Sequence, residues 1–151
     1  MQKPPSMMSK LILLVLLLVS LASRAQSVPP AIPAHDPVMI RQDGTYYLFC
    51  TGNGISVWSS KDRKTWQPEK PVFPAPPAWA VAAVPGFKGH IWAPDISFAN
   101  GQYSLFYSIS AFGKNTSCIG LATNKTLDPA SPDFKWTDHG KVKWLSMVRT
   151  Y

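Results

Sequence analysis

The stretch Asp95-Ile-Ser-Phe-Ala-Asn-Gly-Gln-Tyr-Ser-Leu-Phe, residues 95–106, has the pattern of two strands joined by a tight turn. Its Asn-Gly pair predicts a hairpin, because both central residues of a type I′ turn need positive φ. Residues 36–49 repeat the pattern with an Asp-Gly turn and a second strand that also reads Tyr-x-Leu-Phe. The aspartates that open the two segments lie 59 residues apart, and the turn glycines 57. The sequence therefore predicts a repeat built from strands and turns.

Each repeat has room for four antiparallel strands, as in a propeller blade. Alternating apolar runs at 54–60 and 118–123 predict the third strands, and we expect closing strands near 71–73 and 134–138. The proline-rich stretch PVFPAPPAWAVAAVPGFKGH, residues 71–90, is expected to be a long connection, because helical periodicity is absent. Two blades cannot close a propeller, so we expect residues 35–151 to be a partial propeller that is truncated at its C-terminus.

The N-terminus has the pattern of a secretory signal. Two lysines precede an unbroken apolar run at 11–19, and Ser23-Arg24-Ala25 offers small residues for cleavage after residue 25. The run is too short for a membrane anchor, which needs about 20 apolar residues. We expect a signal peptide at 1–25, a proline-rich leader at 26–34 and secretion to the periplasm or the extracellular space.

The charge distribution bears on nucleic-acid binding, and the two cysteines bear on a possible disulfide. The chain of 151 residues has a formal net charge of +7, and removal of residues 1–25 leaves twelve basic and eight acidic side chains with no basic stripe. This distribution does not predict nucleic-acid binding. Cys50 and Cys118 either pair in an oxidising compartment or serve as small buried hydrophobes.

Asp36 and Asp95 each lie beside a proline and at the expected start of an innermost strand. The innermost strands of a propeller converge on a channel, so both carboxylates are predicted to reach one cavity near Trp92 and Phe112. Carboxylates and aromatic rings suit a sugar, because carboxylates can cleave glycosidic bonds and rings stack on sugar faces. Alternatively, each aspartate caps neighbouring backbone N–H groups.

Three stretches together resemble endo-1,5-α-L-arabinanases of glycoside hydrolase family 43. They are HDPVMIRQDGTYYLFCTGNGISVWSSKDRKTW, GHIWAPDISFANGQYSLFYSISAFGKNTSCIGLATN and WTDHGKV, and the likeness extends over residues 34–142. The resemblance implies an all-β, five-bladed β-propeller, of which this chain covers about the first two blades. It also implies cleavage of α-1,5-L-arabinofuranosyl linkages in arabinan, a pectin side chain, by an inverting mechanism.

The resemblance also assigns roles to residues. Asp36 matches the general base, Trp92 an aromatic that shapes the cleft, and Phe112 and Gly113 a loop that contacts arabinose units. Asp95 matches neither of the other two catalytic acids, so we expect it to position substrate hydroxyls.

The general acid and the residue that tunes its pKa are both expected beyond Tyr151, because Glu69, the single glutamate present, is predicted to be solvated in a turn. This chain alone is therefore expected to be inactive.

Other interpretations remain open at this point. An exo-acting arabinofuranosidase or β-xylosidase of the same fold, a non-catalytic secreted carbohydrate-binding protein and an extracellular structural repeat protein all fit the pattern. We expect no cofactor within this chain, because His35 and His90 belong to no metal-ligand spacing. The resemblance allows a structural ion in a complete propeller, with its ligands outside this stretch.

Overall fold

The computed structural model describes Met7, Met8 and residues 31–142, and all β-strands lie in the compact unit that starts at Ile32. The predicted signal peptide, apart from the two methionines, and most of the leader lie outside the described residues. So does the segment beyond residue 142. None of the helices in the part that is described has the length and apolar character needed to cross a membrane.

The first sheet contains four antiparallel strands in the order β1-β2-β4-β5. Their bounds are Val38–Gln42, Thr45–Cys50, Ser56–Ser60 and Gln67–Glu69. The turn between β1 and β2 is the predicted Asp43-Gly44 pair, and both residues have positive φ, 46° and 79°. The first predicted hairpin is therefore confirmed.

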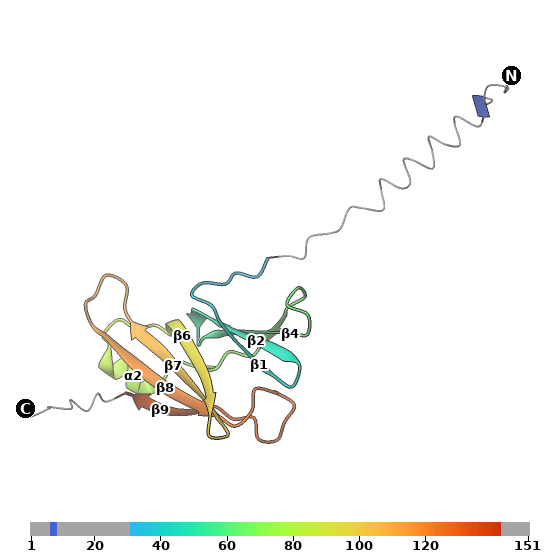
Figure 1. Cartoon of the computed structure of the whole chain (residues 1–151). Helices are drawn as coiled ribbons and strands as arrows, with labels where there is room; N and C mark the ends of the chain where they lie inside the picture. The colour runs from blue at the N-terminus through green and yellow to red at the C-terminus, as the bar shows by residue number, and fades with distance from the viewer. Residues whose placement is uncertain (1–6, 9–30, 143–151) are drawn as a thin grey trace, which may run out of the picture. The chain divides into compact units, whose positions relative to one another are not determined.

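The second sheet contains five strands in the order β3-β6-β7-β8-β9, shown in green, yellow, orange and red in Figure 1. Their bounds are Gly52–Asn53, His90–Ala99, Gln102–Ser110, Ser117–Asn124 and Thr137–Lys141. The Asn100-Gly101 turn again has positive φ at both positions, 53° and 73°. The short strand β3 comes from the first repeat but pairs with β6, and so links the two repeats directly.

The expected closing strand at residues 71–73 is wrong. The edge strand β5 ends at Glu69, and Pro71 has no N–H with which to extend a ladder. Instead, the N–H groups of Val72 and Phe73 bond the carbonyls of Ile55 and Gly54, at 3.3 and 2.9 Å. The chain thus crosses the end of the first sheet and buries Val72 in the core.

The connection predicted at 71–90 contains no strand before β6 begins at His90, but it does contain the helix α2, Ala78–Ala83. Sequence analysis missed this helix because its six residues are too few to show helical periodicity. Its alanine-rich composition favours a helix locally. Trp79 on this helix donates from Nε1 to Asp138 Oδ2 at 2.8 Å and thereby fixes α2 against β9.

One hydrophobic core joins both sheets and the connection between them. Tyr47 and Phe49 of the first sheet, Leu105 and Tyr107 of the second, and Val84 beyond α2 are all buried in it. Strands β1 and β2 also contact β6, and these elements lie next to one another in Figure 1. The packing holds the end of β2 against the middle of β6, where the expected site residues lie.

Both cysteines are free and buried, Cys50 in β2 and Cys118 in β8. Burial raises the pKa of the Cys50 thiol, which keeps it protonated and unreactive. Of the two alternatives from the sequence, the structure shows small buried hydrophobes and no disulfide.

Candidate active site

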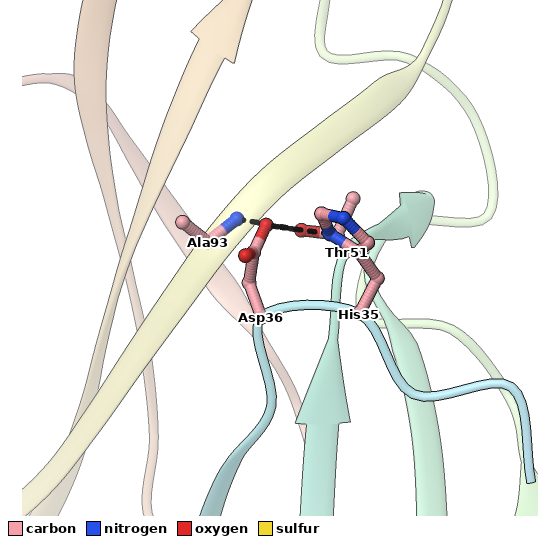
Figure 2. Close-up of polar contacts among 4 residues, drawn as sticks. All are labelled: His35, Asp36, Thr51 and Ala93. Atoms are coloured by element: carbon pink, nitrogen blue, oxygen red, sulfur yellow. Dashed lines mark hydrogen bonds and ion pairs between the residues drawn. The ribbon is translucent and has the colours of Figure 1, made fainter.

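Asp36 lies two residues before β1, at a position where its backbone has φ +48°. Its side chain is 44% exposed. Oδ2 accepts a hydrogen bond from Thr51 Oγ1 at 2.9 Å and another from His35 Nδ1 at 2.9 Å. Oδ1 has no hydrogen bond to any of the residues described. The carboxylate therefore keeps one oxygen held and the other open to solvent (Figure 2).

The two hydrogen bonds lower the pKa of the Asp36 carboxyl, and the Thr51 hydroxyl is the larger cause, followed by the His35 ring. Both donors stabilise the ionised form, so Asp36 is a carboxylate at neutral pH. An exposed, ionised carboxylate with a free oxygen can accept a proton from a water molecule. The geometry therefore suits a general base.

Thr51 connects the first repeat to β6. It is half-buried in the link between β2 and β3, and its Oγ1 accepts a hydrogen bond from the Ala93 N–H at 2.8 Å. Sequence analysis did not select this residue. The available signal was a hydroxyl side chain directly after the buried run Tyr-Leu-Phe-Cys at 47–50, where a polar residue at a strand end can bond its neighbours.

Strand β6 is irregular where it passes the Thr51 side chain. Its pairing with β7 shifts register between Trp92 and Asp95, and Ala93 has φ +42°. Pro94, which has no N–H to donate, lies within this β-bulge. Bulges re-aim neighbouring side chains, and here the residue just before the bulge is Trp92.

Trp92 is half-buried and packs against Phe112, with ring centroids 5.8 Å apart and planes inclined by 48°. Its ring also lies 6.0 Å from that of His90. Phe112 follows β7 and is 91% exposed, and Gly113 beside it has φ +70° with open space around its Cα. The structure thus brings Trp92, Phe112 and Gly113 together, and the Thr51–Ala93 bond ties Asp36 to the strand that carries Trp92.

Asp95 does not lie at a strand start, as the sequence analysis expected. β6 begins at His90, so Asp95 is in the middle of the strand, where it pairs with Phe106. The Trp-Ala-Pro run before it forms the bulge and continues the strand, which is why the sequence pattern was misread. Asp95 is exposed and accepts no hydrogen bond from the described residues. Its role in positioning a substrate stays a prediction.

The surroundings of Glu69 also differ from the prediction, which put it in a solvated turn. It is half-buried in β5, and its Oε1 accepts a hydrogen bond from Ser59 Oγ at 2.7 Å. The residue closes an edge strand and does not lie in a solvated turn. It also borders a cavity of about 170 Å³ between β5 and the connection from β8 to β9. The cavity is lined mainly by Tyr47, Phe49, Leu127, Phe134 and Trp136, none of which belongs to the predicted site.

The family resemblance allows an ion in a complete propeller, with its ligands outside this stretch. Within Met7, Met8 and residues 31–142, no three His, Cys, Asp or Glu side chains converge on one point. The residues present therefore do not fit a metal site, and no step in the chemistry is assigned to an ion.

An exposed carboxylate tied to the strand that carries Trp92, with Phe112 packed against that ring from the loop after β7, defines a candidate carbohydrate site on a strand-built fold. The chain belongs to the glycosyl hydrolases family 43, whose model matches residues 30–148. The family resemblance noted from the sequence is confirmed, and so is the all-β, strand-rich fold. The number of blades stays a prediction.

Two curated relatives illustrate the similarity. The chain is 53% identical over 129 residues to an extracellular exo-α-(1→5)-L-arabinofuranosidase of Cellvibrio japonicus, covering 85% of this chain and 36% of the relative. It is 40% identical over 112 residues to an extracellular endo-α-(1→5)-L-arabinanase of Bacillus subtilis, covering 72% and 33%. The chain therefore spans about a third of the length of these relatives, and their names include both exo and endo action.

The chain is also similar to solved structures of arabinanases. An α-L-arabinanase of Cellvibrio cellulosa complexed with arabinohexaose matches with a TM-score of 0.73 and 53% identity, covering 76% of this chain and 36% of that one. An exo-1,5-α-L-arabinanase from a bovine ruminal metagenomic library matches with a TM-score of 0.70 and 56% identity, covering 73% and 37%.

Proposed function

We propose that the complete protein containing this chain is a secreted glycoside hydrolase that cleaves α-1,5-L-arabinofuranosyl linkages of arabinan with inversion. The observation that carries the proposal is the Asp36 carboxylate, which has one oxygen held by two donors and the other free. The names of the relatives support arabinan as the substrate and an extracellular location. We further propose that residues 35–151 form the first two blades of a five-bladed propeller, after a signal peptide at 1–25 and a leader at 26–34.

In this mechanism, Oδ1 of Asp36 accepts a proton from a water molecule while that water attacks the anomeric carbon. The bond from this carbon to the leaving oxygen breaks on the opposite face. A carboxylic acid outside the described residues donates the proton that the leaving oxygen needs. Inversion requires room for the water, so the two carboxyl groups should lie about 6.5–9.5 Å apart.

The aromatic pair would bind the substrate. Trp92 and Phe112 offer ring faces on which furanose units can stack, and the open backbone at Gly113 lets a sugar approach closely. Asp95 would accept hydrogen bonds from sugar hydroxyls. These contacts would orient the chain so that a glycosidic bond lies beside the water that Asp36 activates.

The proposal is tested by replacing Asp36 with asparagine in the complete protein and measuring hydrolysis of linear arabinan. We expect kcat to fall by about 10²–10⁴, the typical contribution of a general base. The matched control is Asp43→Asn, which lies in the turn at the other end of β1 and should leave kcat unchanged. A proton NMR spectrum of the first product should show the anomer of inverted configuration.

Retained activity in Asp36→Asn, or a first product of retained configuration, would refute the mechanism. If Asp36→Asn and the unaltered protein both bind arabinan but neither hydrolyses it, the protein is a carbohydrate-binding module.

An exo-acting enzyme is the second candidate, because the relative at 53% identity is named an exo-arabinofuranosidase. The course of product release from linear arabinan separates the two modes. An endo enzyme gives a mixture of oligosaccharide lengths and a rapid fall in viscosity, whereas an exo enzyme gives one short product from the start. Aryl glycosides test for β-xylosidase activity.

A further inference from the structure

We propose that Thr51 is a positioning residue that selects Oδ1 of Asp36 as the reacting oxygen and couples the carboxylate to the bulge beside Trp92. The inference rests on the proposed function, in which Asp36 is the general base. It is carried by the hydrogen bonds of a single hydroxyl group, shown with His35 and Ala93 in Figure 2.

The direction of the hydrogen bonds follows from the chemistry of the hydroxyl. A threonine hydroxyl has one proton to donate and lone pairs with which to accept. Because the Ala93 N–H donates to Oγ1 at 2.8 Å, the hydroxyl proton is free for Asp36 Oδ2 at 2.9 Å. The hydroxyl is thereby held from two sides, one of them a backbone group of the long strand β6.

The backbone of Thr51 is held as well. Its N–H donates to the carbonyl of His35 at 2.9 Å, so Thr51 contacts both residues of the pair that precedes β1. Asp36 has φ +48°, a region that non-glycine residues occupy at an energetic cost. Two bonds from Thr51, one to each residue of the pair, keep Asp36 in this conformation.

The same hydroxyl serves the bulge in β6. The pairing of β6 with β7 breaks between Trp92 and Asp95, and Thr51 accepts the N–H of Ala93 inside that break. This hydrogen bond gives the Ala93 N–H a partner where the register of the ladder breaks, so Thr51 stabilises the irregular backbone. Thr51 Oγ1 therefore bonds both the Asp36 carboxylate and the backbone of β6 next to Trp92.

The consequence is that the orientation of the Asp36 carboxylate is fixed, because rotation about its Cβ–Cγ bond breaks the hydrogen bonds to both donors. His35 Nδ1 also bonds Oδ2, and His35 is the titratable group that contacts Asp36 in the described part of the chain. One oxygen, Oδ1 in this structure, is therefore left without a donor and is the one available to accept a proton. Misplacement of a catalytic group by about 1 Å can cost about 10²-fold in rate.

If Thr51 had only a structural role, its replacement would affect folding but would leave the pKa of Asp36 unchanged. The variants are therefore chosen to separate a structural role from a positioning role. Thr51→Val keeps the shape but removes the hydroxyl, and Thr51→Ser keeps the hydroxyl. The matched control is Thr65→Val, because Thr65 Oγ1 bonds Asp62 Oδ2 at 3.3 Å in the turn at the opposite end of the same sheet.

Two readouts are measured on the complete protein. Carbon-13 NMR titration of the labelled Asp36 carboxyl reports its pKa without any need for activity. The pH dependence of kcat/KM on linear arabinan reports the same group in catalysis. Because the Thr51 donor lowers the pKa of Asp36, its removal should raise that pKa and move the acid limb of kcat/KM to higher pH.

We expect Thr51→Val to show the raised pKa and a fall in kcat of about 10- to 100-fold, with Thr51→Ser and Thr65→Val close to the unaltered protein. Thr51→Ala replaces the valine variant if that variant fails to fold. An unchanged Asp36 titration in Thr51→Val, or a serine variant that behaves like valine, overturns the inference. If the unaltered protein does not hydrolyse arabinan, the proposed function fails, and the NMR titration still decides whether Thr51 holds Asp36.

Discussion

At the scale of single residues, the Asp138 carboxylate accepts hydrogen bonds from two aromatic side chains, Tyr107 and Trp79 of α2. The Tyr107 hydroxyl donates to Asp138 Oδ1 at 2.7 Å, and Trp79 Nε1 donates to the other carboxylate oxygen at 2.8 Å. Burial, followed by the bond to Asp138, raises the pKa of the Tyr107 phenol. The phenol thus stays a neutral donor, and one carboxylate joins α2, β7 and β9.

Gly120 is required by the ring of Tyr107. The two residues are directly opposed in β7 and β8, and a Cβ on Gly120 would overlap the ring, which is 1% exposed. We expect Gly120→Ala to lower the free energy of unfolding by about 1–3 kcal/mol, as overpacking typically does. Denaturant unfolding checks the value.

A double-mutant cycle supplies the control. With Tyr107→Leu already present, Gly120→Ala should cost clearly less, because the steric conflict is with the ring. An equal cost in both backgrounds would show that the alanine acts through the strand backbone and not through Tyr107.

At the scale of elements, the two hairpins are the features that local sequence specifies best. Asp43-Gly44 and Asn100-Gly101 both adopt positive φ at both positions, as a type I′ turn requires. Turn chemistry of this kind needs no tertiary contact, so residues 36–49 and 95–106 could be interpreted from the sequence. The path of residues 71–73 could not, because the N–H groups of Val72 and Phe73 bond the carbonyls of Ile55 and Gly54, which lie outside any local turn pattern.

Gly101 tests the turn in isolation. A Cβ placed there meets nothing within 4 Å, so any cost of Gly101→Ala comes from φ +73° alone. We expect a loss of about 1–2 kcal/mol in the free energy of unfolding. Asn100→Gly at the neighbouring position should change it by less than about 0.5 kcal/mol. Equal effects of the two substitutions in thermal or denaturant unfolding would contradict the turn assignment.

At the scale of the whole molecule, the chain carries the proposed base, and the proposed mechanism needs a second carboxyl group to act as the acid. We expect that acid beyond Tyr151 from the family resemblance, and the chain spans about a third of the length of its curated relatives. Loss of a general acid alone typically reduces the rate by about 10²–10⁴. We therefore expect residues 26–151, expressed alone, to release no arabino-oligosaccharides from linear arabinan.

Chromatography of the products measures this prediction, with the complete protein as the positive control. Release of oligosaccharides above the blank by residues 26–151 would contradict it, and it would mean that a carboxylate within this chain serves as the acid.

The sequence by itself determined the two hairpins and the family, because turn chemistry and short motifs are local properties, and it selected Asp36 as the candidate base. The tertiary structure alone decided that Thr51 joins Asp36 to Ala93, that Asp95 lies in mid-strand after a bulge, and that Glu69 closes an edge strand. These features depend on contacts between residues up to 42 positions apart. No local pattern encodes such contacts, because they exist only when the two sheets pack on one core.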